Sequence, residues 1–185
     1  ELSRKTIADK FNVNPKEIIF TSGGTESNNM IIKSVVIAQN VERIISTRIE
    51  HKAVLSSIES IANERGITIL FLDVDKHGLP NKQQLIEYLE NSNERTLVSL
   101  MHINNETGTM IDLDEFGNIC KSYNALFHSD TVQTIGHYKM DLNKINIDFV
   151  TCSAHKFHGP KGVGFAYIRN GQTVTPFIEG GAQER

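Results

Sequence analysis

Short runs of β-branched and aromatic residues alternate with stretches of helical periodicity along this chain, and the alternation limits the folds open to it. Strands are predicted at residues 18–21, 43–47, 67–72, 96–101, 125–129, 147–151 and 163–168. Helices are predicted between them, at residues 25–39, 51–63 and 113–120, and from Asn81 onward with Gln84 completing a capping box. The pattern is typical of an α/β fold, a mostly parallel sheet flanked by helices on both faces (α/β/α).

Composition narrows the functional classes. The chain has 185 residues, 39% of them apolar, which predicts one domain with a real core. A formal charge of -3 without a dense basic run argues against nucleic acid or membrane partners. No apolar run reaches the ~18 residues of a membrane span and the start lacks a signal-peptide pattern, so a cytoplasmic location is expected. Two cysteines, Cys120 and Cys152, suggest neither a disulfide framework nor a metal site.

Polar residues gather directly after the predicted strands. The carboxyl ends of strands in an open α/β sheet converge on one edge, where ligands bind. We therefore expect one site there, built from the Gly-rich turn at residues 22–25, His51, Asn104, Asn105, Asp130, Gln133, Ser153, His155 and Lys156.

This set matches what pyridoxal phosphate requires. The cofactor needs an amine for a Schiff base, a carboxylate for its pyridine nitrogen and a polar cradle for its phosphate. Lys156, Asp130 and the turn that contains Gly24 and Thr25 are one candidate for each. The turn leads into a helix whose N-terminus suits an anion. It lacks the P-loop lysine and the GxGxxG of dinucleotide folds, which disfavours a nucleotide-binding domain.

Each residue also has an ordinary structural interpretation. The turn could be a strand-to-helix connection with a Ser or Thr N-cap, and Asp130 could be an N-cap or a surface residue. Lys156 could be an exposed loop lysine, although a desolvated lysine would favour the free amine that the chemistry needs. His51 could stack on the cofactor ring and act as an acid or base, or be purely structural. Asn105 could hydrogen-bond the ring substituents or sit in a plain turn.

Six stretches in order resemble the NifS/IscS-type cysteine desulfurases, in the class V aminotransferase group of fold type I pyridoxal phosphate enzymes. They are FTSGGTESNN (20–29), EHKAV (50–54), MHINNETG (101–108), HSDTVQ (128–133), SAHKFHGPKGVG (153–164) and GGAQER (180–185). The resemblance covers nearly the whole chain. It implies the large domain of a pyridoxal phosphate-dependent transferase fold.

The resemblance also implies a role for each matching position. Lys156 matches the Schiff-base lysine, Asp130 the partner of the pyridinium and His51 the stacking histidine that assists proton transfer. Gln133 and Asn105 match the residues around the phenolic oxygen, and Val132 the cover of the opposite ring face. The phosphate cradle corresponds to Gly24, Thr25, Ser153 and His155.

The activity implied is conversion of L-cysteine to L-alanine, with the sulfur passing to an enzyme persulfide. Such an enzyme serves iron-sulfur cluster or thio-cofactor biosynthesis, is a homodimer, and hands sulfur to an acceptor such as an iron-sulfur scaffold or a tRNA thiolation protein. Two alternatives stay open: another class V enzyme, such as an aminotransferase or selenocysteine lyase, or a non-catalytic binding module of the same fold.

Departures from the family pattern matter for activity. Neither Cys120 nor Cys152 lies where the family keeps its persulfide cysteine, and both are interpreted as core residues. That cysteine, the arginine for the substrate carboxylate and the threonine lent to the neighbouring subunit fall beyond residue 185 in the family pattern. We expect residues 1–185 to be an incomplete cofactor-binding large domain, without an N-terminal segment and the C-terminal small domain, and inactive alone. Thr131 stands where alanine is usual.

Overall fold

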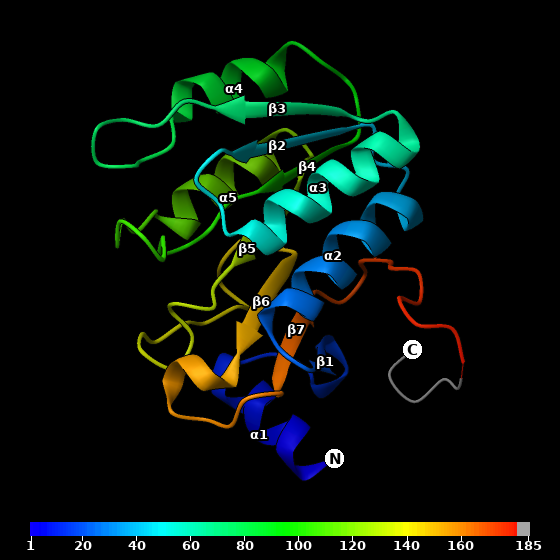
Figure 1. The fold of residues 1–185 in the computed structure, drawn as a ribbon, viewed down its shortest axis with the longest axis vertical. Coiled ribbons are helices and arrows are strands. Elements are labelled where there is room, and N and C mark those ends of the chain that lie inside the picture. The colour runs from blue at the N-terminus through cyan, green and yellow to red at the C-terminus, as the bar shows by residue number, and fades with distance from the viewer. Residues whose placement is uncertain (181–185) are drawn as a thin grey trace.

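A computed structural model describes residues 1–180 and places seven strands in a single sheet with helices on both faces (Figure 1). The strands are β1 (Ile18–Thr21), β2 (Arg43–Thr47), β3 (Thr68–Leu72), β4 (Thr96–Ser99), β5 (Leu126–Asp130), β6 (Phe149–Ser153) and β7 (Gly164–Ile168). The α-helices are α1 (Leu2–Phe11), α2 (Gly24–Ala38), α3 (Lys52–Arg65), α4 (Lys82–Glu90) and α5 (Leu113–Ser122), and two short 3-10 helices are η1 (Pro15–Glu17) and η2 (Ala154–Phe157).

The strand order across the sheet is β1-β7-β6-β5-β4-β2-β3. Strands β6, β5, β4, β2 and β3 pair in parallel, whereas β7 is antiparallel to both of its neighbours, β1 and β6. The prediction of a mostly parallel sheet covered by helices is confirmed. The carboxyl ends of β1, β2, β4, β5 and β6 consequently lie along the same edge.

Alternation along the strands divides the core between the two faces of the sheet. Ile44 packs with α2 and α3 on one face, and the next residue, Ile45, packs with α1, α4 and α5 on the other. Leu126 and Phe127 in β5 divide in the same way. Successive side chains of a strand point to opposite faces, so a strand covered by helices on both sides is apolar throughout. This explains the continuous apolar runs in the sequence.

Helix ends follow local capping chemistry. The Asn81 side chain accepts a hydrogen bond from the backbone N–H of Gln84 (3.1 Å) and so caps α4. The predicted capping box is wrong, because the Gln84 side chain instead accepts from the backbone N–H of Asp73 (2.6 Å). Helix α3 ends at Gly66, whose φ of 68° is the left-handed conformation that glycine adopts without strain.

The main differences between the predicted and the observed elements are one missed helix and two shifted strands. Helix α1 was not predicted, since only Ala8 and Phe11 of its residues are buried and its apolar stripe is short. The strand predicted at residues 96–101 ends at Ser99. The strand predicted at 147–151 begins at Phe149, because the carbonyl of the buried Ile147 accepts from the Arg169 side chain (2.7 Å) instead of joining the sheet.

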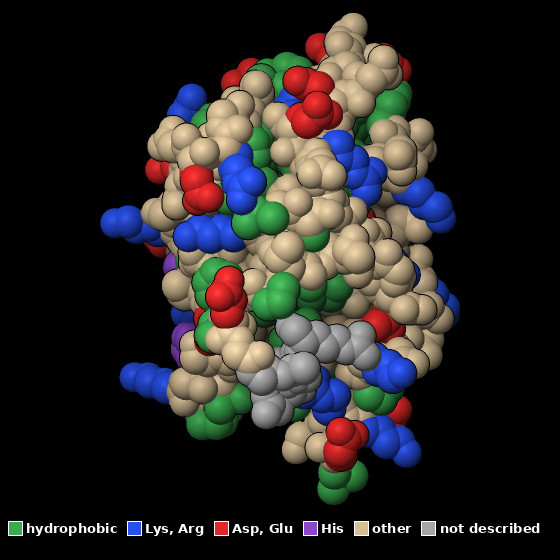
Figure 2. All heavy atoms as spheres, turned by 90° about the vertical axis from the view of Figure 1, so that its right-hand side faces the viewer, with side chains coloured by type: hydrophobic (Ala, Val, Ile, Leu, Met, Phe, Trp, Pro, Cys, Tyr) green, Lys and Arg blue, Asp and Glu red, His purple; other side chains and the backbone are tan. Residues whose placement is uncertain are grey.

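Charged side chains of both signs are interspersed over the face shown in Figure 2. Within residues 1–180, every helix is too short or too polar to cross a bilayer.

Candidate functional site

A cavity of about 460 Å³ opens at the carboxyl ends of the strands. All nine residues to which the family resemblance gives a catalytic or cofactor-binding role line it: Gly24, Thr25, His51, Asn105, Asp130, Gln133, Ser153, His155 and Lys156. Asn28, Met101, Glu106 and Val132 complete its wall. These residues come from the ends of β1, β2, β4, β5 and β6 or from the segments that follow them, which the parallel topology brings to one edge of the sheet.

The turn between β1 and α2 forms one wall of the cavity. Gly23 is the N-cap of α2 with a φ of 150°, a conformation that other residues rarely adopt, and it has no side chain to cap the first helical amides. The interpretation with a Ser or Thr N-cap is therefore wrong. The Glu26 carboxylate accepts from the backbone N–H of Ser22 (2.7 Å) and fixes the turn. A Cβ on Gly24 would lie 2.7 Å from Val132 Cγ2, so only glycine lets this backbone approach the β5 side of the cavity.

Asp130 ends β5 and is 4% exposed. Its Oδ2 accepts from Asn28 Nδ2 (2.8 Å) and its Oδ1 from the backbone N–H of Val132 (3.0 Å). Burial raises the pKa of this carboxyl, while the hydrogen bonds from Val132 and Asn28 and the nearby His51 oppose the rise. A carboxylate held in this way favours a cationic partner in the cavity.

His51 is the N-cap of α3 and lines the cavity from the β2 side. Its Nδ1 accepts from the backbone N–H of Ala53 (3.1 Å), so the neutral ring carries its proton on Nε2. One side chain thus both begins the helix and presents a donor at Nε2.

Lys156 lies on η2, immediately after β6. Its backbone carbonyl accepts from His137 Nε2 (2.8 Å), and Ser153 Oγ is 2.8 Å from His155 Nδ1. These bonds hold the 3-10 turn that presents the lysine. Of the two interpretations of Lys156, the described residues favour the exposed loop lysine, because its side chain is exposed.

Two amides of the NNETG segment differ in function. Asn104 is buried and structural, since its Oδ1 accepts from the backbone N–H groups of Glu106 (2.9 Å) and Thr107 (3.0 Å). Asn105 is exposed at the cavity and donates to Glu106 Oε1 (2.6 Å). The loop therefore presents one polar side chain and uses the other to hold its own shape.

Asn28 is a residue of the candidate site that sequence reasoning missed. It lies inside α2, is buried, and its Oδ1 has no hydrogen-bond partner. Asparagine has a low helix propensity, so its place in a helix one turn after Gly24 was the available signal.

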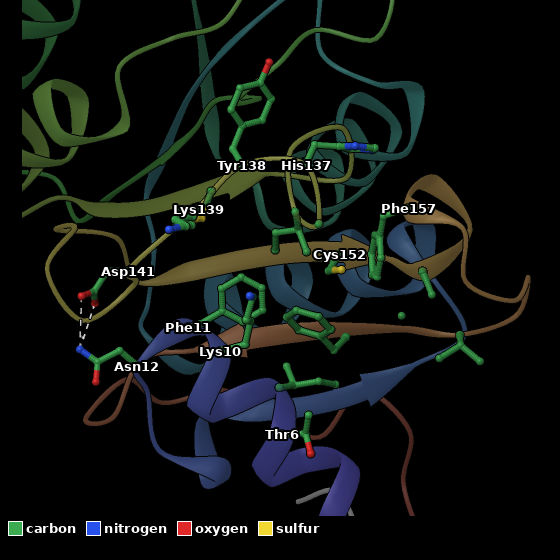
Figure 3. A pocket seen from close by; sticks show the side chains of 18 of the residues that line it. Thr6, Lys10, Phe11, Asn12, His137, Tyr138, Lys139, Asp141, Cys152 and Phe157 are labelled. Atoms are coloured by element: carbon green, nitrogen blue, oxygen red, sulfur yellow. Dashed lines mark hydrogen bonds between the residues drawn. The ribbon is translucent and has the colours of Figure 1, made fainter.

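A larger, mostly apolar cavity of about 820 Å³ lies on the α1 side of the sheet (Figure 3). Phe11, Cys152 and Phe157 border it, and two of its polar side chains, Asn12 and Asp141, pair with each other (3.3 Å). Its lining is mostly apolar, whereas the smaller cavity gathers a carboxylate, a lysine and a histidine, so the smaller polar cavity is the better candidate site.

Both cysteines are buried in the core, as predicted. Burial raises the pKa of the Cys120 and Cys152 thiols well above its usual value, which leaves neither as a reactive thiolate. From residue 181 onward, the GGAQER stretch at 180–185 lies outside the described residues.

The sequence and the fold were compared with known families, proteins and solved structures, and all three comparisons identify relatives. The model of the aminotransferase class-V family matches residues 1–185. The chain is 45% identical over 191 residues to the mitosomal cysteine desulfurase of Trachipleistophora hominis, covering 100% of this chain and 43% of that protein. A solved NifS-like protein superimposes with a TM-score of 0.92 at 42% identity, over 100% of this chain and 51% of the other. SspA in complex with cysteine superimposes with a TM-score of 0.91 at 34% identity, over 98% of this chain and 53% of the other. The chain thus spans about half the length of these relatives.

Proposed function

Because the chain belongs to the aminotransferase class-V family, we propose that it is the cofactor-binding large domain of a pyridoxal phosphate-dependent cysteine desulfurase. The observation that carries the proposal is the convergence of a buried carboxylate, a lysine, a histidine and a glycine turn on one cavity. The names of the relatives and the SspA complex with cysteine support L-cysteine as the substrate.

The residues present fit the cofactor. The buried Asp130 carboxylate calls for a cation, which a protonated pyridine nitrogen supplies. The close backbone approach at Gly24 and the uncapped start of α2 suit a phosphate, with Thr25, Ser153 and His155 beside it. When bound, the cofactor supplies an electron sink for the bonds around the amino acid's α-carbon.

Each side chain has a defined task in this proposal. Asp130 would keep a proton on the ring nitrogen, and Lys156 would supply the amine for covalent attachment. His51 and Val132 would contact the ring, and His51 would donate from Nε2, the atom that its cap bond to Ala53 leaves protonated. Gln133 and Asn105 would bind the phenolic oxygen.

The proposal for residues 1–185 alone is cofactor binding without rapid turnover. The family reaction moves sulfur to an accessible thiol, and both cysteines here are buried. A homodimer, an iron-sulfur or tRNA-thiolation acceptor and a cytoplasmic location remain part of the proposal for the whole protein. Release of alanine and sulfide at enzymatic rates by the 185-residue chain would contradict the expectation of inactivity.

The decisive test is where pyridoxal phosphate attaches. We expect a visible absorption band in the wild type, and after borohydride reduction a cofactor adduct in the peptide that contains Lys156. Lys156→Ala removes both signals, whereas Lys161→Ala, in the following loop, keeps them. An adduct that persists in Lys156→Ala, or that spreads evenly over exposed lysines, would refute the proposed site.

A further inference from the structure

Glu50 is a buried acid next to the candidate site that none of the roles above uses. It lies in the connection between β2 and α3, one residue before His51, and is 8% exposed. Thr47 Oγ1, at the end of β2, donates to its Oε1 (2.8 Å), and the backbone of Met101, which follows β4, is near enough to lower the pKa of the carboxyl group. The Glu50 side chain therefore bonds the His51 turn to the end of β2, beside the segment that follows β4.

The second oxygen of Glu50 has a different environment. Oε2 is buried and has no hydrogen-bond partner. A full negative charge spread over both oxygens would thus be solvated at only one of them. In contrast, both oxygens of Asp130 accept hydrogen bonds, from Asn28 and Val132. Of the two buried carboxyl groups, Asp130 is the one built to be ionised.

The negative charge of the neighbouring Asp130 also favours the neutral form of Glu50. Burial raises the pKa of Glu50 to about 8, and the Asp130 carboxylate facing it from β5 adds to the rise, against the opposing bonds from Met101 and Thr47. His51, one residue away, acts electrostatically on Asp130. Ionising Glu50 would place a second buried negative charge beside the first.

We propose that Glu50 is a positioning residue of the site: a buried neutral acid that holds the turn bearing His51 to the end of β2, beside the segment that follows β4, and leaves Asp130 to carry the buried negative charge. The roles of His51 and Asp130 in this inference rest on the function proposed above. The protonation state of Glu50 does not, so it can be tested without the cofactor.

The first measurement is the titration of the Glu50 carboxyl carbon by NMR in protein labelled with ¹³C-glutamate, with the signal assigned by its loss in Glu50→Gln. We expect a midpoint near pH 8. A signal already ionised at pH 6 would overturn the proposal, whether or not the protein binds pyridoxal phosphate. If the wild type binds no cofactor but Glu50 titrates near pH 8, the proposed function fails and the neutral acid stands.

The second measurement separates positioning from simple space filling. Glu50→Gln keeps the neutral shape and the acceptor for Thr47, so we expect pyridoxal phosphate affinity within about threefold of wild type. We also expect the absorption band of the bound cofactor to shift with pH near pH 8 in the wild type, as Glu50 ionises, and this shift to disappear in Glu50→Gln. Glu50→Ala removes the hydrogen bond that holds the turn to β2, and we expect pyridoxal phosphate affinity to fall about tenfold or more. Glu59→Gln, which removes an exposed carboxylate of α3, changes neither property.

A stability readout covers the case in which Glu50→Ala does not fold. The folded pKa of Glu50 lies above its ordinary 4.5, so its contribution to stability is complete below pH 4.5 and is lost as the pH rises to about 8. Glu50→Gln therefore gains stability relative to wild type between pH 5 and pH 8. Glu50→Gln that weakens cofactor binding as much as Glu50→Ala, or that retains the wild-type pH transition, would refute the proposal.

Discussion

Replacing Gly164 with alanine tests how closely the sheet and the candidate site depend on each other. Gly164 begins β7, where it pairs with Thr21 of β1 and Ser153 of β6. A Cβ at this position would lie 2.5 Å from the carbonyl oxygen of Cys152 and 2.7 Å from the Cα of Gly23. Carbon atoms pack at about 3.5 to 4.0 Å, so the added methyl group overlaps two backbone segments by about 1 Å.

The loss of folding stability in Gly164→Ala should be large, because the backbone atoms that the new methyl group meets cannot rotate away from it. Overpacking of a core typically costs about 1–3 kcal/mol, and we expect Gly164→Ala to lie near or above 3 kcal/mol. The turn at Gly23 is the less constrained side, so it would move away from β7 and distort the proposed phosphate cradle. Losing one hydrogen bond to a charged phosphate costs about 1.5–3 kcal/mol, which corresponds to a roughly 10- to 100-fold weaker pyridoxal phosphate affinity.

Urea unfolding followed by circular dichroism gives the stability change, and titration with pyridoxal phosphate gives the affinity. Gly171→Ala is the matched control, because Gly171 follows the far end of β7, has a φ of 91° and has nothing within 4 Å of an added Cβ. It should lose about 1–2 kcal/mol of stability from backbone strain and no affinity. A Gly164→Ala protein as stable as wild type, or one with unchanged affinity, would refute the reasoning.

Two further predictions concern buried titratable groups. Asp130→Asn keeps the side-chain shape but removes the charge, so pyridoxal phosphate affinity measured by titration should fall about 10- to 100-fold while cofactor-free stability is retained; unchanged affinity would contradict the role of Asp130. Burial lowers the pKa of the fully buried His128 to about 3, so only the unfolded ring gains a proton below pH 6.5. Stability should then fall by about 1.4 kcal/mol per pH unit from this group as the pH drops from 6.5 toward 3. His128→Gln should reduce the slope of unfolding free energy against pH between 4.5 and 6.5, and an unchanged slope would contradict the assignment.

Much of the fold and the arrangement of the site were predictable because periodicity and strand order determine them together. The nine candidate residues lie at or just after the carboxyl ends of strands, and a parallel sheet brings such positions to one edge, so their convergence on one cavity could be predicted without any knowledge of loop structure. The resemblance to NifS/IscS-type cysteine desulfurases is likewise confirmed by the family match and the named relatives. The roles of the nine residues stay predictions.

What the sequence did not reveal depends on contacts between distant residues. The run at residues 163–168 reads as a strand in either direction, so the antiparallel placement of β7 was invisible. The exposure of Lys156 depends on which segments cover η2, a tertiary property. Asn28 and Glu50 are polar residues within otherwise ordinary segments, and only their burial beside Asp130 marks them as part of the site.

The site also implies a link between cofactor binding and folding. Asp130 receives its hydrogen bond from Asn28, 102 residues earlier in the chain, and the Gly23 turn packs against Gly164. The cavity therefore exists only when β1 has paired with β7, a long-range step that joins the two ends of the described chain. A ligand that binds only this closed state stabilises it by about 2.7 kcal/mol at a concentration 100 times its Kd. Pyridoxal phosphate bound here would accordingly stabilise the β1–β7 pairing in addition to taking part in the proposed reaction.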